Sequence, residues 1–305
     1  MDSPSENAEA ARRGCVLLTG ARGFTGTYLR AELEAAGFSV IGGIVGAGAG
    51  PHEVTLDITS LDNCRRVMER IRPDYLVHLA AITFVQHADA EAFYRVNVIG
   101  TLNLLQALAD ARINPRNVVV ASSANIYGNA FSEEIIESQL PQPLNHYGVS
   151  KLAMEHMVHT WADRIPIVVT RPFNYTGVGQ EPHFLVPKIV AHFAQRRSEI
   201  ELGNLDVARE FSDVRMVALA YRRLIEEAPA GETFNICSGV AYSLTEVLAM
   251  MEEIAGYTIK VKVNPVLTRY NEVKRLVGST RKLDAVIGHI NTFPLRQTLA
   301  WMYHA

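Results

Sequence analysis

Short apolar runs alternate with amphipathic stretches along the chain from Cys15 onward. Apolar runs predict buried strands, whereas apolar residues at helical spacing predict helices. The expected strands cover residues 15–20, 38–43, 75–81, 117–123 and 165–174, and the expected helices cover residues 25–37, 61–71, 91–111 and 147–161. Strands separated by helical segments need right-handed crossovers, so the pattern predicts an α/β fold with a doubly wound parallel sheet of the Rossmann type.

The regular alternation ends after Asn174. Residues 175–210 are rich in Gly, Pro and His and contain one expected helix, over 186–197. Residues 233–239 predict a further buried strand that returns to the sheet. Residues 243–256 predict a helix that begins at a capping serine, carries a glutamate three residues on and ends at a glycine.

The change in pattern divides the chain into two parts. We expect residues 1–172 to form a dinucleotide-binding Rossmann domain, to which residues 211–240 return. Residues 173–305 then form a smaller, mixed α/β substrate-binding lobe. Residues 1–13 are acidic and polar, without the apolar segment of a signal peptide, and predict a disordered tail.

Composition narrows the class of partner. The chain has 305 residues, a hydrophobic content of 48%, a charged content of 20% and a net charge of -3, which argues against a nucleic-acid or membrane partner. No apolar segment reaches the length of a membrane span. The three cysteines, Cys15, Cys64 and Cys237, are widely separated and show no metal-binding spacing. Unpaired thiols favour a reducing compartment, so we expect a cytoplasmic protein without a metal.

Three glycines follow the first expected strand. Gly20, Gly23 and Gly26 stand three residues apart in TGARGFTG, between that strand and a helix. Glycines permit a tight turn and close approach of the backbone to a pyrophosphate, which the helix N-terminus attracts. A glycine-rich turn without a ligand is the alternative, but the strand–turn–helix position favours a dinucleotide.

The second expected strand bears on which dinucleotide binds. NAD sites usually carry an acid at the end of this strand, for the ribose 2′-hydroxyl. Here residues 40–46 read VIGGIVG, with no acid before Glu53, and Arg22 lies inside the glycine turn. An arginine suits a 2′-phosphate, whereas a carboxylate would repel it. The sequence therefore favours NADP(H) over NAD.

A tyrosine and a lysine lie one helical turn apart at Tyr147 and Lys151. An ammonium near a phenol stabilises the phenolate, so the pair predicts proton transfer by Tyr147, with Lys151 also available to a cofactor ribose. The same spacing recurs at Tyr270 and Lys274, without hydroxyls at a preceding strand end, and is interpreted there as coincidence. At Tyr147 the serines at the end of the preceding strand favour an active site.

These segments together identify a family. The ordered set TGARGFTG, HLAA, NVIGT, SSANIYG, YGVSK and RPFNYTGVGQ resembles the extended short-chain dehydrogenase/reductases that modify nucleotide sugars. The resemblance implies that Ser123, Tyr147 and Lys151 are the catalytic residues. It also implies a cofactor site formed by Gly20, Arg22, Gly23, Phe24, Gly26, Asp57, Ile58, Ala80, Ala81 and Lys151.

The same resemblance gives the smaller lobe a role. It implies that Asn174 and the arginines Arg209 and Arg269 contact the diphosphate of a nucleotide sugar, and that Glu272 binds a ribose of the nucleotide. Bidentate arginines suit phosphate oxygens. Thr83 and Phe84 are expected near the sugar. The alternative for each arginine is an ordinary surface position.

The pair of residues that directly follows the expected catalytic serine distinguishes between the possible reactions. Dehydratases of this family carry an Asp-Glu pair there, whereas this chain has Ala124 and Asn125, so dehydration is disfavoured. Segments such as GNLDVAREFSDV and FNICSG resemble GDP-4-keto-6-deoxy-mannose reductases, which make GDP-D-rhamnose. We therefore expect an NADPH-dependent 4-ketoreductase with Tyr147 as the proton donor.

Two alternatives stay open. One is an NAD-dependent nucleotide-sugar 4-epimerase, and the other is an inactive, cofactor-binding regulatory protein. The resemblance further implies a homodimer. It leaves the base and the sugar of the substrate undetermined, with a GDP-linked sugar favoured.

Overall fold

The computed structural model describes residues 13–85, 87–129, 133–205, 207–265 and 275–305. Its centre is a seven-stranded sheet in the order β11-β6-β5-β4-β1-β2-β3, with every pair parallel. The strands are β1 (Cys15–Thr19), β2 (Ser39–Ile44), β3 (Glu53–Thr55), β4 (Tyr75–His78), β5 (Asn117–Ala121), β6 (Ile167–Pro172) and β11 (Thr233–Ile236). The strand order reverses between β1 and β4, which places a ligand crevice at their carboxyl ends.

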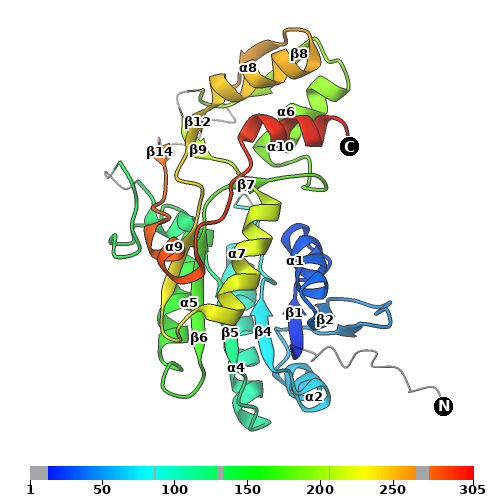
Figure 1. The fold of residues 1–305 in the computed structure, drawn as a ribbon, viewed down its shortest axis with the longest axis vertical. Helices are drawn as coiled ribbons and strands as arrows, with labels where there is room; N and C mark the ends of the chain where they lie inside the picture. The colour runs from blue at the N-terminus through cyan, green and yellow to red at the C-terminus, as the bar shows by residue number, and fades with distance from the viewer. Residues whose placement is uncertain (1–12, 86, 130–132, 206, 266–274) are drawn as a thin grey trace, which may run out of the picture.

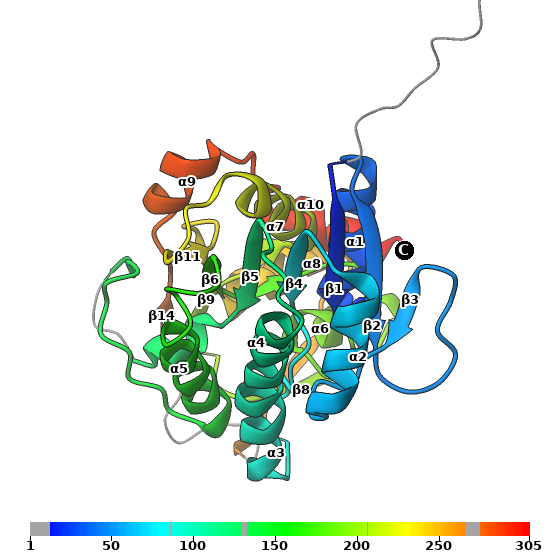
Figure 2. The same cartoon turned by 90° about the horizontal axis from the view of Figure 1, so that it is seen from below.

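Helices cover both faces of this sheet (Figure 2). One face packs against α1 (Phe24–Ala35), α7 (Val214–Glu227) and α9 (Arg281–Ile287). The other packs against α2 (Leu61–Ile71), α4 (Gly100–Asp110) and α5 (His146–His159). The predicted α/β fold with a doubly wound sheet is confirmed.

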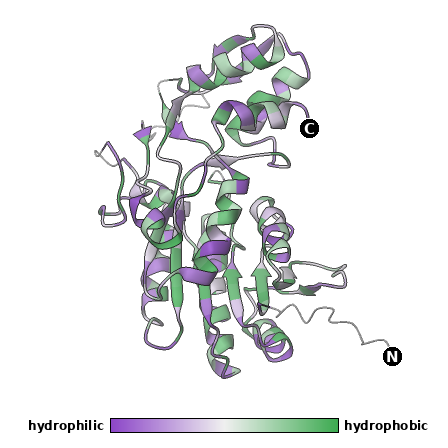
Figure 3. Ribbon diagram, in the orientation of Figure 1, coloured by the Kyte–Doolittle hydropathy of each residue, from purple (hydrophilic) through white to green (hydrophobic). Residues whose placement is uncertain are grey.

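Local sequence explains most of these elements. The branched residues of β1 and β5 are buried between the two helical layers. Figure 3 shows that the central strands are hydrophobic. Ser60 caps α2 by accepting a hydrogen bond from the Asn63 amide. The helix expected over 91–111 is instead α3 (Ala90–Tyr94), a π-helical turn (Arg95–Ile99) and α4.

A smaller lobe lies beyond the carboxyl ends of the sheet (Figure 1). Its helices are α6 (Leu185–Ala194), α8 (Leu244–Ala255) and α10 (Leu295–Tyr303), which share one hydrophobic core. Its strands are β7 (Tyr175–Thr176), β8 (Glu199–Leu202), β9 (Ala208–Glu210), β10 (Ser212–Asp213), β12 (Ala241–Ser243), β13 (Lys260–Val263) and β14 (Arg275–Leu276). Ser243 and Glu246 form a capping box at the start of α8, as their spacing predicts.

Residues 1–12 of the expected tail lie outside the described residues, and Arg13 forms an ion pair with Glu226 on α7. Within the described ranges, no helix is long and apolar enough to cross a membrane.

Candidate active site

The turn between β1 and α1 requires its glycines for different reasons. Gly20 has a φ of +70°, a conformation that side chains rarely adopt. A Cβ on Gly26 would lie 2.2 Å from the carbonyl oxygen of Gly20, so the turn closes only with glycine there. Gly23 precedes the first turn of α1, whose amides are available to an anion.

A cavity of about 210 Å³ opens at this turn, at the carboxyl ends of β1 and β2. Its lining residues are Thr19, Gly20, Arg22, Gly23, Gly43, Ile44, Val45, Leu56 and Ala80. A glycine cradle, helix amides and an apolar wall fit the phosphates and the adenosine of a dinucleotide. Of the residues expected to bind the cofactor, Gly20, Arg22, Gly23 and Ala80 therefore line one cavity.

The other expected cofactor residues are not part of the cavity lining. Phe24 stacks on Tyr175, with ring centroids 6.0 Å apart. Asp57 accepts hydrogen bonds from the amide and hydroxyl of Thr59, and Ile58 is buried. Ala81 is half-buried in the loop after β4.

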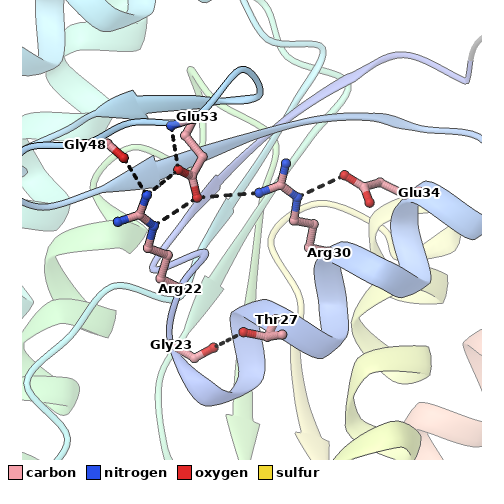
Figure 4. Close-up of polar contacts among 8 residues, drawn as sticks. Arg22, Gly23, Thr27, Arg30, Glu34, Gly48 and Glu53 are labelled. Atoms are coloured by element: carbon pink, nitrogen blue, oxygen red, sulfur yellow. Dashed lines mark hydrogen bonds and ion pairs between the residues drawn. The ribbon is translucent and has the colours of Figure 1, made fainter.

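The structure brings an acid, Glu53, to the glycine turn, although the sequence shows none at the end of the second strand. Strand β3 pairs with β2 so that Glu53 lies beside Gly42. There the Glu53 carboxylate accepts hydrogen bonds from Nε of Arg22 at 3.1 Å and from Nη2 at 2.6 Å (Figure 4). The sequence pattern missed this contact because a three-residue strand after a glycine-rich loop leaves no periodic signal.

Ser123 lies just beyond β5, in the position expected for a catalytic hydroxyl. Its oxygen accepts hydrogen bonds from the backbone amide and the side-chain amide of Asn125, each at 3.1 Å. Because both contacts use lone pairs, the hydroxyl proton remains to be donated elsewhere. The contacts of Asn125 with Ser123 are a feature that sequence reasoning missed, because it considered this position only for the absence of an acid.

Tyr147 begins the buried face of α5 and forms a hydrogen bond with Ser123. Burial raises the pKa of Tyr147 to about 12, although the hydrogen bond with Ser123 lowers it. Lys151 donates a hydrogen bond to the Ala121 carbonyl oxygen at 2.7 Å, and burial lowers its own pKa to about 8. The phenol pKa is therefore raised, in contrast to the lowering that the Tyr147–Lys151 spacing predicts.

A chain of hydrogen bonds beneath the cavity involves His78, which has no role in the sequence prediction. The Ala80 amide donates to the Thr19 hydroxyl, which contacts Nδ1 of His78 at 2.7 Å. Nε2 of His78 contacts the Thr101 hydroxyl at 2.9 Å, and that hydroxyl donates to the Asn97 carbonyl oxygen. Since the Thr101 proton is used, donor counting assigns the proton of the neutral His78 ring to Nε2.

The Asn97 side chain extends this network to helix α5. Its amide nitrogen donates to the Ser150 hydroxyl at 3.0 Å, and Ser150 donates to the carbonyl oxygen of Tyr147. Asn97 lies in the π-helical turn before α4, a local irregularity often found at functional sites. The network therefore joins the strand ends at the cavity to the start of α5.

The expected substrate residues are only partly described. Thr83 and Phe84 are exposed in the loop after β4, and the Phe84 ring meets the edge of His183 from the smaller lobe at 4.9 Å. Asn174 is exposed, and Arg209 is half-buried on β9. The remaining substrate-binding predictions, Arg269 and Glu272, lie outside the described residues, as do Tyr270 and Lys274. Among the described residues, no group of three or more metal-ligating side chains is present.

Comparison with known proteins gives a consistent result. Residues 16–237 match the NAD dependent epimerase/dehydratase family. The chain is 38% identical to a GDP-6-deoxy-D-talose 4-dehydrogenase of Aggregatibacter actinomycetemcomitans, over 94% of this chain and 96% of that one. It is 32% identical to a GDP-6-deoxy-D-mannose reductase of Pseudomonas aeruginosa, over 93% of this chain and 94% of that one.

Solved structures resemble the whole molecule. A crystal structure from Burkholderia cenocepacia J2315, named as a candidate epimerase, superposes with a TM-score of 0.89 at 49% identity and covers 95% of this chain and 96% of that one. The structure of RMD from Pseudomonas aeruginosa complexed with NADPH superposes with a TM-score of 0.85 at 30% identity and covers 95% and 98% of the two chains.

Proposed function

Because the chain belongs to the NAD dependent epimerase/dehydratase family, we propose that it uses NADPH to reduce the 4-keto group of a GDP-linked 4-keto-6-deoxy sugar. The two curated relatives are named for GDP-linked 6-deoxy-D-talose and 6-deoxy-D-mannose, sugars that differ only in configuration at C4. Reduction of one 4-keto precursor from opposite faces yields either sugar. The proposal therefore names the precursor and leaves the product configuration to the assay.

The observation that carries the proposal is the donor arrangement at Ser123 and Tyr147. Because the Ser123 oxygen accepts twice from Asn125, its remaining capacity is its proton, which faces Tyr147 here and would turn to the carbonyl oxygen of a bound substrate. A pKa of about 12 keeps the Tyr147 phenol protonated at neutral pH. Two donors held together suit a carbonyl oxygen that gains negative charge, which is the condition of a ketone being reduced.

Each residue then has a defined task. Bound NADPH supplies a hydride to C4 of the sugar. Ser123 donates a hydrogen bond to the C4 oxygen, and Tyr147 transfers its phenolic proton to that oxygen as the hydride arrives. Lys151, a buried cation held against the Ala121 carbonyl oxygen, stabilises the phenolate that remains.

The binding sites follow the same division. Gly20, Arg22, Gly23, Phe24, Gly26, Asp57, Ile58, Ala80, Ala81 and Lys151 form the proposed cofactor site, and Thr83, Phe84, Asn174, Arg209, Arg269 and Glu272 form the proposed substrate site. The proposed domain boundary divides residues 1–172, with 211–240, from the substrate lobe; of the described elements, β10 groups with the lobe and α9 packs on the sheet. A homodimer in the cytoplasm completes the proposal. Exposed Ile99 and Val149 are apolar positions available to such an interface.

A spectrophotometric assay tests the proposal. NADPH absorbance is followed after the protein is added to freshly prepared GDP-4-keto-6-deoxy-mannose, with NADH and a dTDP-linked ketosugar in parallel. We expect rapid loss of NADPH absorbance with the GDP-linked ketosugar and no loss with Tyr147→Phe. Loss that persists in Tyr147→Phe would contradict the assigned proton donor.

A 4-epimerase is the second candidate, favoured by the structural likeness to the Burkholderia cenocepacia protein. An epimerase retains NAD and uses Tyr147 first as a base and then as an acid, whereas the proposed reductase uses it as an acid. NAD that co-purifies with the protein, together with conversion of intact sugar nucleotides, would support this candidate. A protein that binds cofactor and neither reduces nor epimerises a sugar would be the regulatory alternative.

A further inference from the structure

The ion pair between Arg22 and Glu53 lies at the edge of the cavity at the end of β2 (Figure 4). Three of the five N–H donors of Arg22 are used: Nε donates to Glu53, and Nη2 donates to Glu53 and to the Gly48 carbonyl oxygen at 2.7 Å. In the described part of the chain, Nη1 of Arg22 has no hydrogen bond. The fork therefore leaves one donor edge of the guanidinium available.

The Glu53 carboxylate that holds Arg22 also has partners of its own. The Gly50 amide donates to Glu53 Oε2 at 2.9 Å, and Nη1 of Arg30 lies 3.6 Å from Oε1. Gly42 provides the space, because a Cβ there would lie 2.8 Å from the Cβ of Ala21 and close to both Glu53 and Arg30.

Arg22 and Glu53 differ in how far their side chains are exposed to solvent. The Glu53 side chain is 11% exposed, whereas the Arg22 side chain is 54% exposed. Arg22 lines the cavity and Glu53 does not. A ligand in the cavity thus meets the guanidinium, and the carboxylate acts on that ligand through Arg22.

We propose that Glu53 is a positioning residue for cofactor choice, which holds Arg22 so that its Nη1 edge binds the 2′-phosphate of a phosphorylated dinucleotide. This inference rests on the proposed use of NADPH. On charge alone, the Glu53 carboxylate would be expected to repel the 2′-phosphate, whereas in our proposal it supports phosphate binding through Arg22. These two hypotheses predict opposite changes in NADPH affinity when the charge of Glu53 is removed.

The test measures dissociation constants for NADPH and NADH by fluorescence titration, without a sugar. Arg22→Gln is expected to weaken NADPH about a hundredfold and Glu53→Gln about tenfold, with NADH binding changed less than about twofold. The double variant should equal Arg22→Gln alone, because Glu53 acts only through that residue. Glu53→Asp keeps the charge but shortens the side chain, and should behave as Glu53→Gln does.

Glu34→Gln is the matched control. Glu34 is an exposed acid that pairs with Arg30 in the same cluster, and it does not contact Arg22. Its removal changes the local charge equally and should leave the ratio of the NADPH and NADH constants unchanged. Thermal unfolding of each variant identifies loss of the fold, which would weaken the binding of both cofactors. A change in the ratio of the two dissociation constants without loss of the fold would be specific to NADPH.

Tighter NADPH binding by Glu53→Gln, or equal weakening of both cofactors, would overturn the role of Glu53. A wild-type protein that prefers NADH would instead refute the cofactor of the proposed function. If the protein reduced no ketosugar, the proposed reaction would be wrong. The role of Glu53 would still be decided by the ratio of the NADPH and NADH dissociation constants, because that ratio is measured without a sugar.

Discussion

The buried imidazole of His78 makes the stability of the fold depend on pH in a way that one substitution can isolate. Burial lowers the pKa of His78 from 6.5 to about 3, and the charge of Lys151 lowers it further. Its ring is held between Thr19 and Thr101, and the side chain is 4% exposed. The folded protein therefore keeps the His78 ring neutral. In the unfolded chain the same ring takes up a proton once the pH falls below 6.5, the ordinary pKa of histidine.

The sign and size of the effect follow from proton linkage. His78 imposes no pH-dependent loss above the unfolded value of 6.5, and stability is lost as the pH falls from there toward about 3. Lowering the pH from about 7.5 to about 5 should reduce the free energy of unfolding by about 2 kcal/mol through this group alone.

The perturbation is His78→Asn, whose side-chain oxygen can still accept from Thr19 but does not titrate. At about pH 7.5 it should cost about 1–3 kcal/mol, because Thr101 loses a donor and packing is lost. At about pH 5 the wild-type loss of about 2 kcal/mol should bring the two proteins close together.

Urea unfolding of both proteins at the two pH values measures this convergence. Other titrating groups are common to both proteins and cancel in the difference. If the two proteins lost the same free energy over this range, the neutral, buried assignment of His78 would be wrong.

Three further predictions test other parts of the site. Arg171 and Glu155 form a buried ion pair with contacts of 2.6 Å and 3.0 Å. Glu155→Gln leaves the Arg171 charge without its partner and should lower the free energy of unfolding in urea by about 3–5 kcal/mol. A loss below about 1 kcal/mol would show that the Arg171 charge does not need this partner. Gly26→Ala should weaken binding of either dinucleotide more than tenfold, because the Cβ meets backbone, and titration with unchanged affinity would contradict this account. Asn125→Ala removes a side-chain donor to Ser123 and should reduce kcat about tenfold at nearly constant unfolding free energy, while an unchanged kcat would show that Asn125 does not orient the hydroxyl.

The fold could be predicted because its signals are local. The apolar runs of β1, β4 and β5 are buried on both sides, and the polar residues of these strands stand only at their ends. The caps at Ser60 and Ser243 also depend only on neighbouring residues. Elements defined by such short-range patterns appear in the structure close to their expected bounds.

The parts that were missed depend on contacts between distant residues. Strand β3 has three residues, and its pairing brings Glu53 to Arg22 across the glycine-rich loop. His78 joins the cavity to Asn97 through hydroxyls on separate elements. The raised pKa of Tyr147 likewise comes from burial, which spacing along a helix does not reveal.

The central claim is that a hydride reaches C4 of the sugar, and isotope transfer tests it most directly. The protein is given GDP-4-keto-6-deoxy-mannose and NADPH that carries deuterium at the transferable position of the nicotinamide. The sugar product is then examined by proton NMR. Our account predicts one deuterium at C4, a single C4 configuration and oxidised cofactor in equal amount. Deuterium that stays on the cofactor, while an intact sugar nucleotide is converted to its C4 epimer, would contradict it.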